Sequence, residues 1–241
     1  RGDYLEFSDV LRQPLRGSEL PVVSLFPKAV EWNKQVVIWI DGDGKSGLYD
    51  NADQPRAAIR TLLRGGMAVI GADLVYQGEF LADGEAPRQS RAVSDSPYAG
   101  FTHGYNHSVF AQRTHDLSTL ISWVRHDDHG TDQVHLVGVN GAGPVVAAAR
   151  SQVGGQVDRA AIDTQGFRFV DLKSFREMNF LPGAVKYGDL PGLLALSVPH
   201  RLWIAGEKQV PGLGRRVFEA ADAAERITSF AGPNAEIPNA A

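Results

Sequence analysis

The sequence predicts an α/β protein: a three-layer α/β/α sandwich around a mostly parallel, doubly wound sheet. Short apolar runs rich in β-branched residues recur along the chain, bounded by turn residues, as is typical of strands buried on both faces. Helical patterns lie between these runs, and such alternation indicates parallel strands joined by right-handed crossovers. The 241 residues suffice for one such domain with a large core, so we expect residues 1–241 to form a single domain.

Each expected strand is a short apolar run that ends near a turn residue. These runs are 21–26, 35–40, 67–72, 134–138, 159–162, 201–205 and 226–230. The segments 54–64, 110–125, 144–152 and 215–224 are expected to be helices. In the second of these helices one apolar stripe forms at helical spacing, made of Phe110, Leu117, Leu120, Ile121 and Val124.

The N-terminal part of the chain differs from this alternating pattern. Residues 4–10 and 20–27 are joined by a turn-rich stretch without room for a helix, which predicts an antiparallel strand pair. Two long segments, 74–108 and 166–199, lack clear periodicity. Because loops of that length usually have a function or cover something, we expect 74–108 to be an insertion over a crevice and 166–199 to be irregular.

Composition excludes several classes of function. The formal net charge of −4 gives no electrostatic reason to expect a nucleic-acid partner, and cysteine is absent, so no thiolate chemistry or disulfide can operate. No apolar run approaches the roughly 18 residues of a membrane span, so no membrane partner is expected. The chain opens at Arg1 rather than methionine, and we expect it to be a mature product or one domain of a longer chain.

One segment looks like a catalytic turn without its catalyst. In Gln133–Pro144 (QVHLVGVNGAGP) a buried strand runs into a glycine-rich turn, and an alanine-rich helical run follows. A nucleophile elbow has the pattern G-x-S-x-G, in which small residues flank the nucleophile because the turn is strained and crowded. Gly138 and Ala142 take the flanking positions, so Asn140 stands where the serine belongs. A carboxamide cannot be activated as a nucleophile.

The cofactor and metal motifs are incomplete. The run DGDGKS (41–46) follows a strand, but a phosphate loop needs a glycine where Trp39 stands, and an EF-hand needs an acidic or amide residue where Lys45 stands. His103 and His107 have the spacing of two zinc ligands, yet the residues between them form a poor helix without a glutamate. We therefore expect no cofactor and no metal.

Six segments, taken in order, resemble the α/β-hydrolase fold, specifically the acetyl-xylan-esterase-like and dienelactone-hydrolase-like esterases of bacteria. The segments are VVIWIDGDGK, AVIGADLVYQGEF, RTHDLSTLISWVR, HLVGVNGAGP, RLWIAGEKQVP and RITSFAGPN. The first resembles the strand and turn that supply an oxyanion-hole amide, the fourth the elbow, and the fifth the strand and loop that carry the acid. The resemblance covers about Leu20 to Phe230 and implies secretion or a periplasmic location.

The resemblance also implies positions for a catalytic triad, and all three depart from the family pattern. The nucleophile position is Asn140, and the acid position in the turn Gly206-Glu207-Lys208-Gln209 is Gln209. The family's histidine follows the last strand, and 230–241 contains none. A nucleophile needs its base, and the base needs its acid. The loss of all three triad residues together is therefore what the loss of one of them would lead to. Asp163 or Glu207 as acid and His200 as base are the fallback candidates, or the histidine lies beyond the chain's last residue.

Two functional hypotheses follow from these observations. The first is a non-catalytic esterase-like domain that packs against a catalytic hydrolase domain of the same chain, forms a homo-oligomer or binds carbohydrate. The alternative is an active carboxylic-ester hydrolase with an unusual catalytic set. Tyrosines of the insertion would either stack on sugar rings or pack their own loop. The candidate binding residues are Asp41, Gly42, Asn140, Gly141, Tyr76 and Tyr105.

Overall fold

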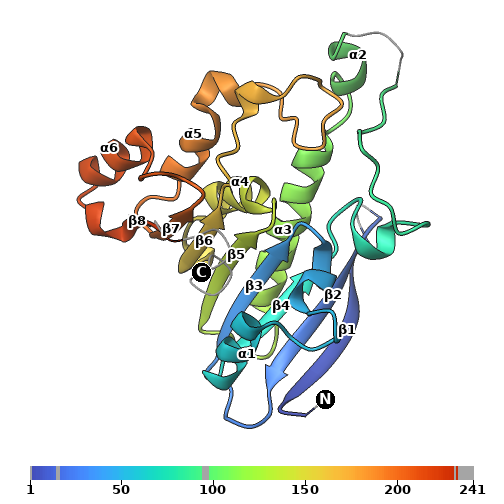
Figure 1. Ribbon diagram of the computed structural model, residues 1–241, viewed down its shortest axis with the longest axis vertical. Coiled ribbons are helices and arrows are strands. Elements are labelled where there is room, and N and C mark those ends of the chain that lie inside the picture. The colour runs from blue at the N-terminus through green and yellow to red at the C-terminus, as the bar shows by residue number, and fades with distance from the viewer. Residues whose placement is uncertain (1, 15–16, 94–97, 231, 233–241) are drawn as a thin grey trace.

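The structure, a computed structural model, describes residues 2–14, 17–93, 98–230 and 232. Within these residues the strands form one eight-stranded sheet of order β1-β2-β4-β3-β5-β6-β7-β8 (Figure 1). The strands are β1 (Tyr4–Gln13), β2 (Ser18–Pro27), β3 (Gln35–Asp41), β4 (Ala68–Ala72), β5 (Gln133–Val139), β6 (Arg159–Asp163), β7 (Arg201–Ala205) and β8 (Ile227–Ser229).

Strand directions follow the expected pattern. The β1–β2 and β2–β4 pairs are antiparallel, and every other neighbouring pair in the described sheet is parallel. The antiparallel N-terminal pair and the mostly parallel sheet are therefore confirmed. Of the expected strands, 226–230 is the most shortened, because β8 retains only three residues.

The four expected helices are present, with additional short ones. The α-helices are α1 (Ala57–Arg64), α2 (Gly100–His103), α3 (Val109–His126), α4 (Gly143–Val153), α5 (Asp189–Ala195) and α6 (Gly212–Ala220). The 3-10 helices are η1 (Gly44–Leu48), η2 (Gly78–Phe80), η3 (Gly154–Gln156), η4 (Phe169–Asp171), η5 (Ala184–Tyr187) and η6 (Ala224–Arg226).

Helix α5 corrects the expectation that 166–199 is irregular. Pro191 and Gly192 are residues typical of turns, but proline is tolerated in a first helical turn, where its missing N–H would have no helical acceptor. Leu190 and Leu194, one turn apart, are both fully buried and attach the helix to the core. Tertiary burial thus overrides the local turn signals.

The core consists of two layers on opposite faces of the sheet. On one face α3, α4, α5 and α6 pack against the strands, and the expected apolar stripe of α3 is buried there. On the other face, α1 contributes Ile59 and Leu63 to the core and the 3-10 helix η1 contributes Leu48. Among the described residues, no helix is both long and apolar enough to span a membrane.

The parallel strands bring polar residues together at one edge of the sheet. Strands β3, β5, β6 and β7 run in the same direction, so the residues at their carboxyl ends share that edge (Figure 1). Open α/β sheets bind ligands in the crevice outside this edge. The turns that follow these four strands therefore form the candidate site.

Candidate functional site

The turn between β5 and α4 has the backbone of a nucleophile elbow. Asn140 has φ 51° and Gly141 φ 86°, a left-handed pair directly after the strand. Such strain is characteristic of the elbow, and asparagine is among the non-glycine residues that tolerate it best. A Cβ at Gly138 would lie 2.7 Å from Val146, so the small residue expected there is required by packing. The described turn thus presents an exposed carboxamide at the position that the sequence pattern predicts for a nucleophile.

Two carboxylates of the β3 turn hold the Asn140 side chain. Its Nδ2 donates to Asp41 Oδ1 at 2.8 Å and to Asp43 Oδ2 at 3.0 Å. The backbones of the two turns also touch, since a Cβ at Gly42 would lie 1.9 Å from the Asn140 carbonyl oxygen. The proximity of Asp41, Gly42, Asn140 and Gly141 was expected from the sequence. Asp43 belongs to the incomplete EF-hand motif of residues 41–46, and the sequence did not predict its hydrogen bond to Asn140.

Asp41 is the buried member of this cluster. Burial raises its pKa above the ordinary value of 3.8, against the opposing effect of hydrogen bonds from the Asp43 amide and from Asn140. Its Oδ1 accepts the Asp43 N–H at 3.0 Å, so this amide of the β3 turn is already engaged. The side chain packs onto η1, where a Cβ at Gly47 would lie 2.2 Å from its Cγ. The carboxylate is therefore fixed in position and poorly solvated.

This raised pKa predicts how Asp41→Asn changes the pH dependence of stability. A carboxyl group whose pKa is higher in the folded than in the unfolded protein destabilises the fold as pH rises above its ordinary value of 3.8. The asparagine Oδ1 can still accept both hydrogen bonds but carries no charge. We expect Asp41→Asn to match the parent at acid pH and to be more stable near pH 7.

Urea unfolding of both proteins at several pH values measures this difference. Asp50→Asn is a suitable control, since Asp50 is exposed and hydrogen bonds lower its pKa, so the opposite sign is expected. A parent that gains stability relative to Asp41→Asn as pH rises from 4 to 7 would contradict the prediction.

The start of the 74–108 segment packs against the β3 turn. Gln77 Nε2 donates to the carbonyl oxygens of Asp41 at 3.2 Å and Gly42 at 2.8 Å. Beside it, the buried Asp73 carboxylate accepts both the backbone N–H and the Nζ of Lys45, at 2.9 and 2.8 Å. These bonds anchor the segment to the turn that carries Asp41 and Asp43. No sequence motif pointed to Gln77, because the contact depends on folding.

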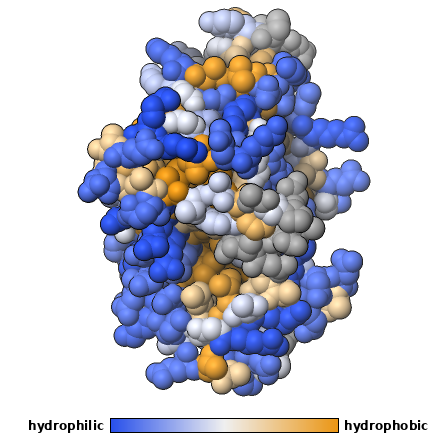
Figure 2. All heavy atoms as spheres, turned by 60° about the vertical axis from the view of Figure 1, so that its left-hand side comes forward, coloured by the Kyte–Doolittle hydropathy of each residue, from blue (hydrophilic) through white to orange (hydrophobic). Residues whose placement is uncertain are grey.

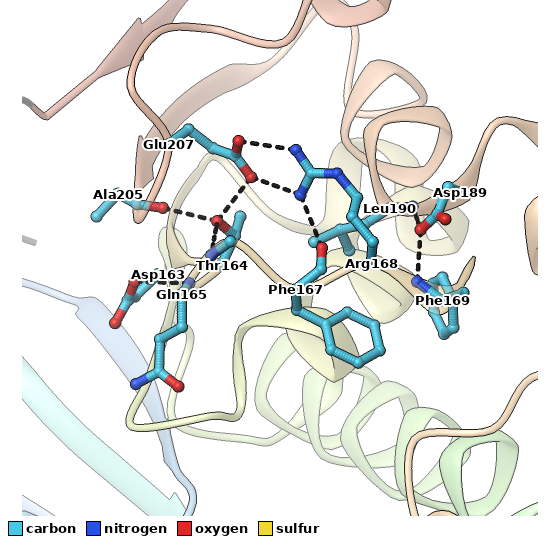
Figure 3. A network of polar contacts seen from close by, with 11 residues as sticks. Asp163, Thr164, Gln165, Phe167, Arg168, Phe169, Asp189, Leu190, Ala205 and Glu207 are labelled. Carbon is cyan, nitrogen blue, oxygen red and sulfur yellow. Dashed lines mark hydrogen bonds and ion pairs between the residues drawn. The ribbon is translucent and has the colours of Figure 1, made fainter. Parts of the chain in front are cut away.

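After β7, the carboxylate that faces its neighbours is Glu207 (Figure 3). Arg168 donates from Nη1 and Nη2 to its two carboxylate oxygens, both at 2.8 Å, and Thr164 Oγ1 lies 2.8 Å from Oε1. Hydrogen bonding to Glu207 raises the pKa of Arg168, which stays charged. Gln209, the expected acid position, is exposed and has no hydrogen bond to any described residue. The acidic group of this turn is thus already paired with an arginine.

The fallback candidates Asp163 and His200 lie at opposite ends of the parallel strands. Asp163 ends β6 beside Ala205, whereas His200 precedes β7, so five residues, or about 16 Å of strand, separate them. Asp163 Oδ1 accepts the Gln165 N–H at 3.0 Å and so caps the backbone that follows β6. The structure therefore does not bring His200 to the crevice, and these two residues form no acid–base pair.

The two tyrosines of the candidate binding set differ in burial. Tyr76 is half-buried with φ 62° and lines a cavity of about 380 Å³ between the 90–93 segment and the start of α3. Tyr105 is fully exposed. A separate cavity of about 830 Å³ runs along α3, lined by His107 and Asp116 and not by Asn140. Neither Asn140 nor Gly141 lines the cavity at Tyr76.

Comparison with known proteins gives a match in structure alone. No family model matches the chain, and no curated sequence matches it either. A solved structure assigned as an acetyl xylan esterase, from Bacteroides fragilis NCTC 9343, has a TM-score of 0.68 at 13% identity, over 95% of this chain and 66% of its own. The methylesterase BT1017 matches at 0.63 and 16%, over 98% and 53%.

A third similar structure has a shorter chain than the first two. It is assigned as a dienelactone hydrolase from Klebsiella pneumoniae subsp. pneumoniae MGH 78578, with a TM-score of 0.55 at 16% identity, over 95% of this chain and 86% of that one. Together with the sheet order and the elbow, these likenesses identify the fold as that of the α/β-hydrolases. The chain spans about two thirds and about half of the length of the first two structures.

Proposed function

We propose that this chain is a non-catalytic α/β-hydrolase domain, which supports or binds rather than cleaves. The observation that carries the proposal is the Asn140 carboxamide, which stands at the nucleophile position and is held by Asp41 and Asp43. The lone pair of an amide nitrogen is delocalised into its carbonyl group, so the Asn140 side chain cannot attack a carbonyl carbon.

The charge around the elbow also opposes ester hydrolysis. Acyl transfer develops negative charge on the substrate oxygen, which hydrolases stabilise with N–H donors from the elbow and from the β3 turn. Here the β3 turn presents two carboxyl groups, and its Asp43 N–H is engaged by Asp41. Repulsion from these groups would raise the barrier that an oxyanion hole lowers.

The proposed role is that of a partner or carbohydrate-binding domain in an acetyl-xylan-esterase-like protein. The likeness to longer esterase structures supports this, as does the exposed polar group at the elbow. Asn140 and Asp43 are exposed, and amide and carboxylate groups are suitable partners for sugar hydroxyls. A catalytic domain in the same protein would supply the chemistry that this elbow lacks.

Hydrolysis of p-nitrophenyl acetate and acetylated xylan by the purified chain tests the proposal. We expect no rate above that of buffer, for the chain and for Asn140→Ala alike, and no labelling by a fluorophosphonate probe. Asn140→Ser is also expected to stay inactive, because the described elbow has no histidine to activate the serine. A rate that Asn140→Ala abolishes while the protein stays folded would refute the proposal. A rate unchanged in Asn140→Ala would reveal a different catalytic set.

Thermal unfolding with xylo-oligosaccharides tests the binding role. A ligand that binds only the native state at a hundred times its Kd stabilises it by about 2.7 kcal/mol. We expect a rise in Tm that Asp43→Asn combined with Asn140→Ala removes. The double variant Asp53→Asn and Asn51→Ala, in an exposed turn, is the matched control and should keep the rise. An unchanged Tm for the parent would restrict the role to packing against a partner.

A further inference from the structure

A groove lies on the face of the sheet that α1 covers only in part. It has a volume of about 340 Å³, and its floor includes Val37, Val137, Ala161 and Trp203, from β3, β5, β6 and β7. The opposite face of the same strands is packed by α3, α4, α5 and α6. Figure 2 shows hydrophobic residues reaching the surface between hydrophilic ones on the side of the molecule that carries β7 and β8. Parallel strands are normally covered on both faces, so this apolar floor favours an apolar occupant.

A row of basic residues borders one end of this floor. His135 pairs with Arg159, and Arg159 with Arg201, in the registers of β5–β6 and β6–β7. In-register neighbours of parallel strands point to the same face, about 4.8 Å apart. Neither the Arg159 nor the Arg201 guanidinium has a hydrogen bond or ion pair with any described residue. Two adjacent, unneutralised guanidinium groups repel each other, and an anion between them would relieve that repulsion.

His135, at the same end of the groove, provides an independent observation. Its side chain is buried, with 8% of its surface exposed, and its Nδ1 has no hydrogen-bond partner, whereas Nε2 lies 3.3 Å from Gln35 Oε1. A buried polar atom without a partner is costly, so such atoms commonly mark the place of a water or ligand. The acidic residue that lines the groove, Glu225, is engaged with Arg226 at 3.3 Å and leaves Arg159 and Arg201 uncompensated.

From this arrangement we infer that the groove binds a free small-molecule amphipathic anion. Its carboxylate or sulfonate head lies on Arg159 and Arg201, and its ring or chain lies on the half-buried Ala161 and Trp203. Arginine suits the head because its planar fork donates two parallel hydrogen bonds to such a group. The tail is stabilised by covering the apolar floor.

This groove is distinct from the elbow. His135 lies at the amino end of β5 and Asn140 just beyond its carboxyl end, about 16 Å away along the strand. The groove faces α1, and the two sites share no residue. Binding of an anion in the groove is therefore independent of whether the elbow is catalytic.

Fluorescence titration with 8-anilinonaphthalene-1-sulfonate tests the inference. N-phenyl-1-naphthylamine is the control probe, because it has the same aromatic rings but no sulfonate group. We expect one sulfonate molecule to bind per chain and dodecanoate to displace it. Arg159→Gln combined with Arg201→Gln should weaken sulfonate binding about tenfold or more, because hydrogen bonds to charged groups are lost. The same variant should leave binding of the uncharged amine unchanged. Ala161→Leu, which fills the floor, should weaken both.

Arg215→Gln combined with Arg216→Gln on exposed α6 removes the same charge elsewhere and should bind like the parent. Near-ultraviolet circular dichroism confirms that each variant is folded. Sulfonate affinity that is equal in the two double variants would overturn the inference, as would several equivalent binding sites. A dimer that Arg159→Gln and Arg201→Gln dissociate would assign the groove to a second copy instead. Binding that appears only after removal of residues 231–241 would assign it to this chain's own end, and both results would overturn the proposal.

Discussion

Gly143→Ala is expected to lower the free energy of unfolding by about 3 kcal/mol, as overpacking of a tight core contact does. Gly143 begins α4, and a Cβ there would lie 1.9 Å from the backbone oxygen of Asp163 at the end of β6. Neither atom belongs to a flexible side chain, so the helix or the strand must shift. For a domain of this size the loss corresponds to a fall in Tm of roughly 6 to 12 °C.

Differential scanning calorimetry of the purified variant measures this fall. Gly212→Ala, at the first residue of α6, is the matched control, because its nearest contact is the flexible end of Arg216 at 3.7 Å. That substitution should leave Tm unchanged or raise it slightly, since alanine restricts the unfolded chain. Equal Tm values for the two variants would mean that the contact between α4 and β6 is looser than the structure indicates.

Arg168→Met is expected to cost about 2 to 3 kcal/mol of stability. The Glu207 carboxylate that Arg168 contacts is 10% exposed, and removal of the arginine leaves a nearly buried charge without its partner. This expected loss of stability is smaller than the usual cost of breaking a buried ion pair, because the Arg168 side chain is 27% exposed. Glu207→Gln in the same background should recover much of the loss, since the amide needs no counter-charge.

Urea unfolding of the single and double variants gives the coupling between the two side chains, expected at about 1.5 kcal/mol or more. The exposed Arg12–Glu19 pair, with side chains 73% and 56% exposed and a distance of 2.9 Å, provides the comparison. Arg12→Met should cost less than about 0.5 kcal/mol because exposed pairs contribute little. Equal losses for Arg12→Met and Arg168→Met would show that the Glu207 network contributes nothing particular to the fold.

These two predictions concern the same crevice from opposite sides. The contact at Gly143 positions the elbow relative to β6, and the Arg168–Glu207 pair ties the turn after β7 to the segment after β6. Both therefore stabilise the edge of the sheet that carries Asn140. The resemblance to the α/β-hydrolases implies that the turn after β7 carries the acid that orients a histidine. Here its carboxylate is paired with Arg168 instead, an arrangement consistent with the proposed loss of catalysis.

The local pattern of the chain determined the α/β class, the mostly parallel sheet, the antiparallel entry and the elbow with Asn140. Periodicity and turn residues are local properties, because burial on one or both faces directly restricts which side chains a strand or helix can carry. The apolar stripe of α3 and the small residues around Asn140 were therefore predictable. The left-handed conformation at Asn140 is consistent with the same glycine-rich pattern.

Tertiary structure alone decided which side chains meet. Asp43 and Asn140 are 97 residues apart, and Arg168 and Glu207 are 39 apart, so no local pattern marks either pair. The separation of Asp163 from His200, and the row of His135, Arg159 and Arg201, follow from strand register, which long-range pairing sets. Hydrogen bonds and ion pairs act over a few ångströms in space, whatever the distance along the chain, and only the folded sheet brings those residues within reach.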